Sequence, residues 1–348
     1  MLIVPKVDCS KEMLGFHADR VTLGCAEQRE MRERRSNGQT RLENGLATDG
    51  HPLPTEFVPQ GSYAMRTMVQ DADCDYDIDD GVYFLSGDLA DEYGVPLRPL
   101  AARERVCAAL HHDERVYPAE VKTNCVRQAY YDGYHIDLPV YRVTVAANGD
   151  SVCELASGES WVESDARAVT GWFTDLVGEL NRDAADGSQM RRIVKVTKKF
   201  ARSRKEWKPK TTSGICITKL IADYFVEADG RDDSALLATW RSVYDALCRG
   251  TRIDHPVPGM MPLAESGDDK VAFFRDKLGW ALGVLKVLDR GDCDRAAARA
   301  AWDEVFDVTY FSSQPSDDDS GGKSGARRSF VTASGATAQR DDGGRRYG

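Results

Sequence analysis

Alternating acidic residues between positions 75 and 79 constrain this chain more than any other feature. The run reads Asp75-Tyr76-Asp77-Ile78-Asp79. In an extended strand, successive side chains point to opposite faces, so the three carboxylates share one face while Tyr76 and Ile78 share the other. Like charges crowded on one face repel one another. The pattern therefore indicates a strand that presents its carboxylates to a divalent cation such as Mg2+, which prefers oxygen ligands.

Two other interpretations of this acidic run deserve comparison. Clusters of acidic residues are commonly solvated loops, and in isolation this run fits that description well. A calcium-binding EF-hand loop is also rich in Asp, but its template requires Gly at the sixth position and Glu at the twelfth. Counted from Asp75, those positions hold Asp80 and Ser86, so the EF-hand template fails.

A third carboxylate on a later segment favours the metal-binding interpretation. Residues 134–141 read YHIDLPVY. In an extended conformation Ile136, Leu138 and Val140 form an apolar face, and Asp137 lies on the opposite face together with His135. The sequence thus predicts a second strand that carries a single carboxylate beside a buried face.

A Gly-Ser pair precedes the acidic run, within the segment Gln60-Gly61-Ser62. Glycine allows the backbone to approach a phosphate group closely. Ser62 offers a hydroxyl group at the start of a predicted helical turn, where free backbone N–H groups favour an anion. A lone Gly-Ser pair carries little information, but one followed by two spaced aspartates and a later single aspartate resembles the polymerase-β-like nucleotidyltransferases.

Four segments in this order, QGSYAMRT, DYDIDDGVYF, YHIDLPVY and TSGICITKLIADYF, together with a lysine-rich helix before the last, resemble the cGAS/DncV-like nucleotidyltransferases (CD-NTases) of bacterial CBASS antiphage systems. The resemblance covers about residues 10–310. It implies an α+β fold: a polymerase-β-like nucleotidyltransferase lobe of mixed sheet and helices at 1–160, with an N-terminal bracing helix, and an all-helical oligoadenylate-synthase-like lobe at 161–311. Residues 312–348 form a tail.

The resemblance also implies a chemistry for these residues. Asp77, Asp79 and Asp137 are then the catalytic acids and hold two Mg2+ ions, with Mn2+ as a substitute, while ATP and other nucleoside triphosphates are the substrates. Repeated transfer with release of pyrophosphate would close a cyclic di- or trinucleotide, which serves as a second messenger in antiphage defence. The identity of the bases, the ring size and the linkage are not readable from the sequence.

The lysine-rich segment at 189–207 has the spacing of an amphipathic helix, with apolar residues on one side and basic residues on the other. A basic face is commonly just solvated, yet in an acidic protein with a metal site it suits a triphosphate. The resemblance implies that a lysine on this helix contacts nucleotide phosphate, with Lys199 as the best match and Lys198 next. Ser213 precedes a further predicted helix, whose start can face phosphate or base.

The N-terminal bracing helix is expected from Ser10 to Asn37. Ser10 is a suitable N-cap residue, and the Asn37-Gly38 pair is a typical stop signal. A separate short helix is expected over 40–49.

Bulk composition limits the partners and the compartment. The 348 residues carry a formal net charge of −10, so no stable nucleic-acid complex is expected, and polyphosphate must be held by a local basic patch. An odd number of cysteines, nine, without a C-x-x-C pair favours reduced thiols. We find neither a signal-peptide pattern nor a run approaching about 20 apolar residues. A cytoplasmic, monomeric protein without membrane contact is the expectation.

The tail from residue 312 is rich in Gly, Ser, Asp and Arg and poor in large apolar residues, which predicts disorder. In the family that the chain resembles, ubiquitin-transfer-like enzymes attach many synthases to other molecules through a C-terminal glycine, and Gly348 fits that use. Two alternatives remain open: a linear-oligonucleotide or small-molecule nucleotidyltransferase, and a nucleotide-binding protein without activity that is conjugated through its C-terminus.

Overall fold

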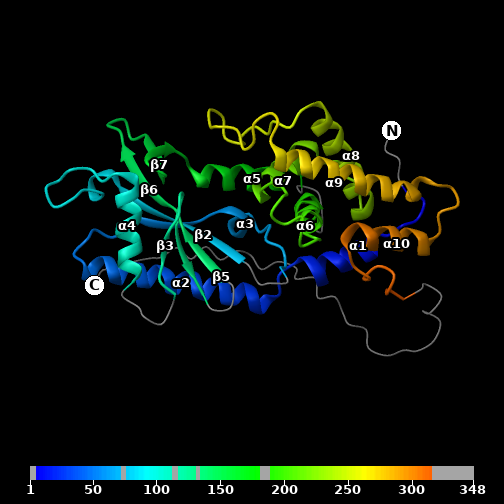
Figure 1. Cartoon of the computed structure of the whole chain (residues 1–348), viewed down its shortest axis with the longest axis horizontal. Helices are drawn as coiled ribbons and strands as arrows, with labels where there is room; N and C mark the ends of the chain where they lie inside the picture. Colours follow the sequence, from blue (N-terminus) through cyan, green and yellow to red (C-terminus); the bar gives the residue numbers. More distant parts are fainter. Residues whose placement is uncertain (1–4, 72–75, 112–116, 131–133, 181–188, 316–348) are drawn as a thin grey trace. The chain divides into compact units, whose positions relative to one another are not determined.

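The acidic run opens β2 (Tyr76–Leu85), the central strand of an eight-stranded mixed sheet. The strand order is β3-β4-β5-β2-β6-β7-β8, and β1 (Glu56–Pro59) pairs with β2 in the antiparallel sense. β2 pairs in parallel with both β5 (Tyr134–Leu138) and β6 (Val140–Val145). Figure 1 shows these strands gathered at one part of the molecule. The predicted strand around Asp137 is thus a direct neighbour of the acidic strand.

The coordinates are a computed structural model that describes residues 5–71, 76–111, 117–130, 134–180 and 189–315. Contacts group Met1–Ser312 into one unit and Ser313–Gly348 into a second. The remaining strands are β3 (Glu120–Val121), β4 (Val126–Ala129), β7 (Ser151–Ser157) and β8 (Ser160–Glu163). The helices are α1 (Ser10–Phe16), α2 (Cys25–Thr48), α3 (Gly61–Ala64), α4 (Pro99–Leu110), α5 (Ala166–Leu180), α6 (Gln189–Ala201), α7 (Gly214–Tyr224), α8 (Asp232–Arg249), α9 (Asp269–Val284) and α10 (Arg295–Phe306).

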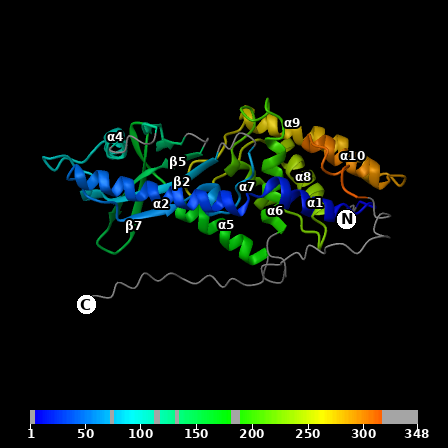
Figure 2. The ribbon, with the colours of Figure 1, turned by 90° about the horizontal axis from the view of Figure 1, so that it is seen from below.

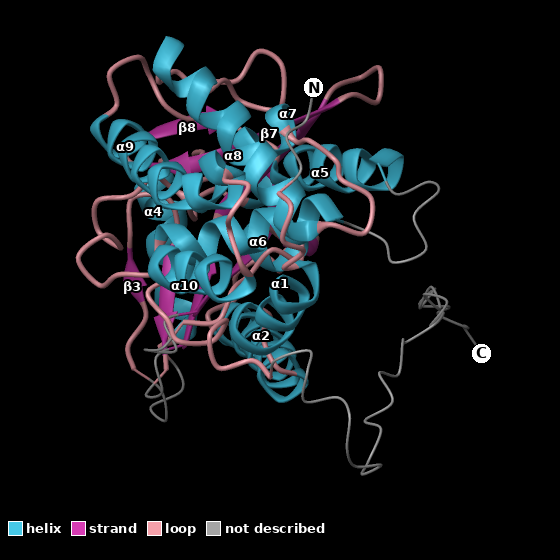
Figure 3. Cartoon of the chain, turned by 90° about the vertical axis from the view of Figure 1, so that its right-hand side faces the viewer, coloured by secondary structure: helices cyan, strands magenta, loops and turns pink. Residues whose placement is uncertain are grey.

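Two large apolar cores match the predicted α+β class with a helical C-terminal part. One core lies between the sheet and helices α2 and α4, and includes Ile78 and Ile136. Figure 2 shows α2 running beside β2 and β5. The other core joins α1 to helices α5–α10 and is centred on large side chains such as Trp240 and Trp302. Figure 3 shows α1, α6, α8 and α10 packed together. The lobe boundary near residue 160 stays a prediction.

The N-terminal helix differs from the expectation. α1 ends at Phe16, a π-helical turn follows over His17–Val21, and α2 starts at Cys25. α2 then runs through the expected stop at Asn37-Gly38 to Thr48, so the predicted end and the separate short helix were wrong. The glycines of α2 serve packing instead. A Cβ on Gly45 would lie 1.9 Å from the Ala109 carbonyl oxygen of α4, so the two helices meet at a distance that only glycine permits.

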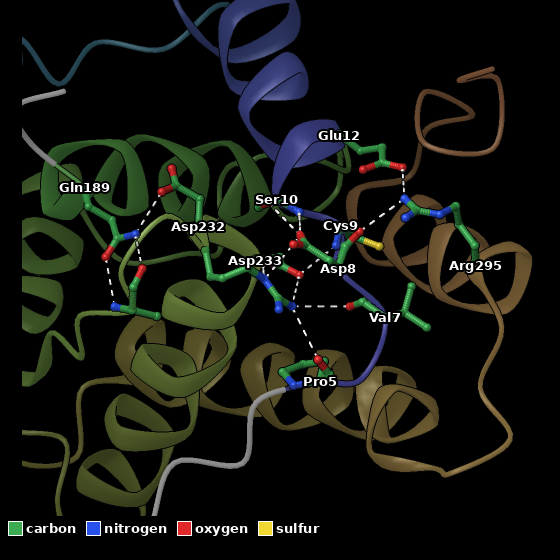
Figure 4. A network of polar contacts seen from close by, with 12 residues as sticks. Pro5, Val7, Asp8, Cys9, Ser10, Glu12, Gln189, Asp232, Asp233 and Arg295 are labelled. Atoms are coloured by element: carbon green, nitrogen blue, oxygen red, sulfur yellow. Dashed lines mark hydrogen bonds and ion pairs between the residues drawn. The ribbon is translucent and has the colours of Figure 1, made fainter. Parts of the chain in front are cut away.

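Polar contacts fasten the start of the chain to the helical core (Figure 4). The Cys9 amide donates to Asp233 Oδ2 at 2.9 Å, and Arg295 Nη1 donates to Glu12 Oε1 at 2.8 Å. Glu12 is buried. α1 therefore belongs to the helical core, whereas α2 belongs to the sheet, and the segment between them links both cores. None of the helices in the described residues is long and apolar enough to cross a membrane.

Candidate active site

Strand β2 sorts its first residues onto two faces as predicted. Tyr76 and Ile78 are buried in the sheet core, whereas Asp77 is exposed and Asp79 is half-buried on the opposite face. Asp75 lies outside the described residues. The alternation of the sequence thus holds where the structure describes it, and it leaves two carboxylates pointing away from the apolar core.

Strand β5 adds the third carboxylate. The register of the parallel pair places Asp137 opposite Asp79 and His135 opposite Asp77. His135 Nδ1 lies 3.7 Å from Asp77 Oδ1. Asp137 is buried with only 8% of its surface exposed. All three acids of the predicted set therefore meet at one place on the sheet.

An arginine that the sequence interpretation missed stands among these acids. Arg127 of β4 lies opposite Asp137 in the antiparallel register. Its Nε donates to Asp137 Oδ1 at 2.8 Å and its Nη2 to Asp137 Oδ2 at 2.7 Å. The same Nη2 lies 3.2 Å from Asp77 Oδ1. Because one guanidinium nitrogen contacts both carboxylates, Asp77 and Asp137 lie close together.

Burial and charge crowding act strongly on Asp79. Desolvation is the largest influence, and with the charges of Asp137 and Asp77 it raises the pKa of Asp79 to about 7, against the opposing charge of Arg127. The pKa of Arg127 is itself raised, chiefly by its hydrogen bond to Asp137. Asp79 thus combines desolvation and neighbouring like charge, the two causes by which functional sites raise the pKa of a carboxylate.

The Gly-Ser turn packs directly on Asp79. Gly61 has a φ of +60°, and a Cβ there would lie 2.1 Å from Asp79 Oδ2. The backbone N–H of Gln60 donates to the backbone carbonyl oxygen of Asp79 at 2.9 Å. Ser62 is half-buried in the short helix α3 that follows. Glycine at position 61 therefore allows the turn to rest against the carboxylate with no side chain between them.

A cavity of about 430 Å3 opens in front of these residues. Its wall contains Gln60, Gly61, Ser62, Asp77, Asp79, Lys198 and Ser213 of the predicted site, together with Met65, Thr67, Met68, Val69, Ser164, Ala166, Val169, Arg202, Gly214 and Ile215. The Gln60 side chain is buried, where its Oε1 accepts from Tyr141 Oη at 3.2 Å. Asp137 is not among the residues that line this cavity, but it is the neighbour of Asp79 on the adjacent strand.

Of the two candidate lysines, Lys198 faces the cavity. Its side chain is buried, and Nζ donates to Thr67 Oγ1 at 2.8 Å. Burial lowers the pKa of Lys198 to about 7, and the charges of Arg202 and Lys195 act in the same direction. Lys199, the sequence's first choice, is half-buried and directs Nζ to the Gln70 carbonyl oxygen at 3.0 Å. Lys198 therefore lines the cavity, whereas Lys199 is not among its lining residues.

Helix α7 brings the last predicted residue to the same cavity. Ser213 caps the helix, with its Oγ accepting from the Cys216 amide at 3.4 Å. Lys198 packs against Gly214, where a Cβ would lie 3.5 Å from the lysine Cε. Arg202, one turn beyond Lys198, also lines the cavity and belongs to the lysine-rich segment at 189–207, but the sequence analysis did not single it out. Its spacing of four residues from Lys198 is the signal that could have identified it.

The residues present fit a hard divalent cation in chemical type. All three acids offer carboxylate oxygens, and the guanidinium of Arg127 among them shows that this spot already attracts positive charge. Within the described ranges, however, no three His, Cys, Asp or Glu side chains are arranged as a ready metal-binding group. The two-pronged bond from Arg127 explains this, because it engages both carboxylate oxygens of Asp137, the third acid.

Comparison with known proteins finds relatives of the segment that carries this site. Residues 55–141 match the family model described as cyclic GMP-AMP synthase DncV-like, nucleotidyltransferase domain. Over these residues the chain is similar to the nucleotidyltransferase domain of DncV-like cyclic GMP-AMP synthases. The match runs from the residue before β1 to Tyr141 in β6, so the matched segment contains the Gly-Ser turn and all three acids.

Individual relatives are distant. A cyclic GMP-AMP synthase from Escherichia albertii is 25% identical over 198 residues, which are 55% of this chain and 42% of that protein. The match thus spans less than half the length of this curated relative. The structure of Vibrio cholerae DncV with the linear intermediate 5′ pppA(3′,5′)pG has a TM-score of 0.67 at 14% identity, covering 87% of this chain and 96% of the other. Escherichia coli MS115-1 CdnC with ATP has a TM-score of 0.63 at 19% identity, covering 87% and 99%. These structures share the fold.

Proposed function

We propose that this protein is a nucleotidyltransferase that joins nucleoside triphosphates, releases pyrophosphate, and closes a cyclic di- or trinucleotide. The observation that carries the proposal is the cavity in which the Gly61-Ser62 turn rests on Asp79 while Lys198 and Ser213 arrive from distant helices. A cavity lined by both carboxylates and cations suits a nucleotide whose reacting phosphate contacts both kinds of group.

Each residue of the cavity receives a role in this proposal. Ser62 and the open backbone of the turn bind phosphate oxygens, and Lys198 and Ser213 hold the far end of the triphosphate. Asp77, Asp79 and Asp137 would hold divalent ions, Mg2+ or Mn2+, which when bound supply activation of an attacking ribose hydroxyl and neutralisation of the leaving group. Catalysis by the chain itself is then placement of the reactants and electrostatic stabilisation.

The product class is proposed from relatedness. The domain is DncV-like, and the curated relative that it matches is named a cyclic GMP-AMP synthase. We extend this to a second messenger for antiphage defence, made in the cytoplasm. Gly348 lies outside the described residues, and conjugation of this C-terminal glycine by a ubiquitin-transfer-like enzyme is part of the proposal.

Product analysis tests the function. The purified full chain is incubated with labelled ATP, GTP, CTP and UTP and with Mg2+ or Mn2+, then with phosphatase, and products are identified by mass spectrometry. We expect pyrophosphate and a product that resists phosphatase, because a ring has no terminal phosphate. A phosphatase-sensitive product would instead support the linear enzyme. Absence of pyrophosphate with every nucleotide and both metals would contradict the proposal and favour the non-enzymatic alternative.

The lowered pKa of Lys198 predicts a pH dependence of nucleotide binding. A lysine with a pKa of about 7 is mostly neutral above that pH, yet a triphosphate requires it charged, so binding takes up a proton. Affinity for a non-hydrolysable nucleotide should therefore fall between about pH 7.5 and 9, by up to about tenfold per pH unit. This range lies above the pKa of about 6 typical of a terminal phosphate. Calorimetry in two buffers of different ionisation enthalpy measures the proton uptake directly.

Matched variants separate Lys198 from its neighbour in this test. Lys198→Arg keeps a positive charge throughout the range and should flatten the profile, whereas Lys199→Arg should preserve it because Lys199 bonds elsewhere. A wild-type affinity that is constant from pH 7.5 to 9, with no proton uptake, would remove Lys198 from the phosphate site.

A further inference from the structure

Arg127 makes contacts that the proposed chemistry does not use. It approaches from β4, and its two-pronged bond to Asp137 is the strong geometry for an arginine–carboxylate pair. The third contact, 3.2 Å to Asp77 Oδ1, reaches across to β2. Arg127 therefore sits between two of the three acids that would hold the divalent ions.

The position of the Arg127 guanidinium affects how strongly the three acids can bind a cation. Asp77, Asp79 and Asp137 are like charges at short range in a partly buried site, and a cation among them relieves their repulsion. A guanidinium already in that place repels a second cation, and it occupies both oxygens of Asp137. A divalent ion and Arg127 thus compete for the same carboxylates.

We propose that Arg127 is a built-in counter-ion that holds Asp137 and Asp77 in place while no metal is bound, and that a divalent ion must displace it. The inference rests on the proposed function, since it names the residue that controls metal entry to the same site. A nucleotide triphosphate brings negative charge and further oxygen ligands, so metal enters the site together with nucleotide rather than ahead of it. Arg127 is a positioning residue in this scheme, because it acts through the carboxylates.

Removing the guanidinium should strengthen metal binding by the nucleotide-free protein. We expect Arg127→Gln in the full chain to bind Mn2+ at least about tenfold more tightly than wild type, as measured by electron paramagnetic resonance of free Mn2+ without nucleotide. An affinity equal to or weaker than that of wild type would overturn the proposal. The Mn2+ affinity is measured without turnover, so the effect of Arg127 on metal binding can be tested even if the protein proves not to be a nucleotidyltransferase.

The chain offers a matched control in Arg142. This arginine of β6 forms the same two-pronged pair with Glu154 directly opposite on β7, at 2.6 and 2.9 Å, in the same sheet but away from the acids. Arg142→Gln should cost similar thermal stability and leave Mn2+ affinity unchanged. An equal tightening in Arg142→Gln would show a non-specific charge effect and overturn the proposal.

Two further measurements keep the test decisive. Arg127→Lys retains the charge but loses the two-pronged geometry, so it should fold readily and bind Mn2+ with an affinity between those of wild type and Arg127→Gln. If Arg127→Gln fails to fold, a wild-type Mn2+ affinity in Arg127→Lys overturns the inference. With a non-hydrolysable nucleotide present, the difference between wild type and Arg127→Gln should narrow severalfold. A difference that instead stays constant when nucleotide binds would contradict coupled entry of metal and nucleotide.

Discussion

Asp79→Asn is expected to lower pyrophosphate release from nucleotide by about 10³-fold or more, while the metal-free protein unfolds at a temperature no lower than that of wild type. The loss of rate follows because Asp79 is the acid that touches the Gly-Ser turn and lines the cavity. Stability should be kept because Asp79 is a desolvated carboxylate beside two others, so a neutral amide of the same shape relieves repulsion. A coupled pyrophosphate assay and thermal unfolding with EDTA measure the two effects.

The next residue provides the contrasting control. Asp80 is fully buried on the opposite face of β2, where Gln39 Nε2 donates to its Oδ2 at 2.7 Å and Arg35 Nε lies 3.2 Å from its Oδ1. Asp80→Asn should cost about 2 kcal/mol of unfolding free energy and leave turnover per folded molecule within about threefold of wild type. If Asp79→Asn retained more than a tenth of the wild-type rate while Asp80→Asn lost it, the assignment of the two faces would be reversed.

The acidic strand was predictable because its information is local. A period of two over a few residues determines which side chains share a face, and the burial of Tyr76 and Ile78 against the exposure of Asp77 follows it. The alternation of residues within one strand does not determine the register between that strand and its neighbours. That Asp137 stands opposite Asp79 depends on how two distant segments align, and in the sequence this was supported by resemblance alone.

Arg127 escaped prediction for a related reason. It lies on a four-residue strand, β4, whose residues carry no motif, and its role arises only when β4 pairs with β5. The choice between Lys198 and Lys199 also required the fold. Adjacent residues on a helix differ by about 100° in direction, and only the placement of α6 against the turn and α7 decides which one meets the cavity.

The break in the N-terminal helix shows the limit of stop signals. Asn37-Gly38 is a valid terminator by its chemistry, but Gly38 lies within α2, where a Cβ would be 3.2 Å from Ile136 Cδ1. Gly38 is explained by the close packing of α2 against the sheet, which is a tertiary feature. The actual break, at residues 22–24, lies where α1 leaves the helical core and α2 joins the sheet core.

Gly61→Ala is expected to reduce pyrophosphate release by about 10²-fold or more, the effect of a displacement of about 1 Å at reacting groups. Two physical terms act together at this position. The φ of +60° is costly for alanine by about 1–2 kcal/mol, and the new Cβ would lie 2.1 Å from Asp79 Oδ2. Since a contact of that length cannot exist, either the turn or the carboxylate must move, and each is part of the proposed site. The rate is measured under saturating nucleotide and metal.

Gly50→Ala separates the effect of backbone strain from the effect of the contact between the new Cβ and Asp79. Gly50 has a φ of +72°, similar to that of Gly61, but no atom lies within 4 Å of a Cβ there. It should therefore lose about 1–2 kcal/mol of stability through backbone strain alone and keep its turnover. An equal loss of rate in both variants would mean that strain, transmitted through the fold, accounts for the effect. A loss confined to Gly61→Ala would mean that direct contact between the turn and Asp79 sets the geometry of the site, as we propose.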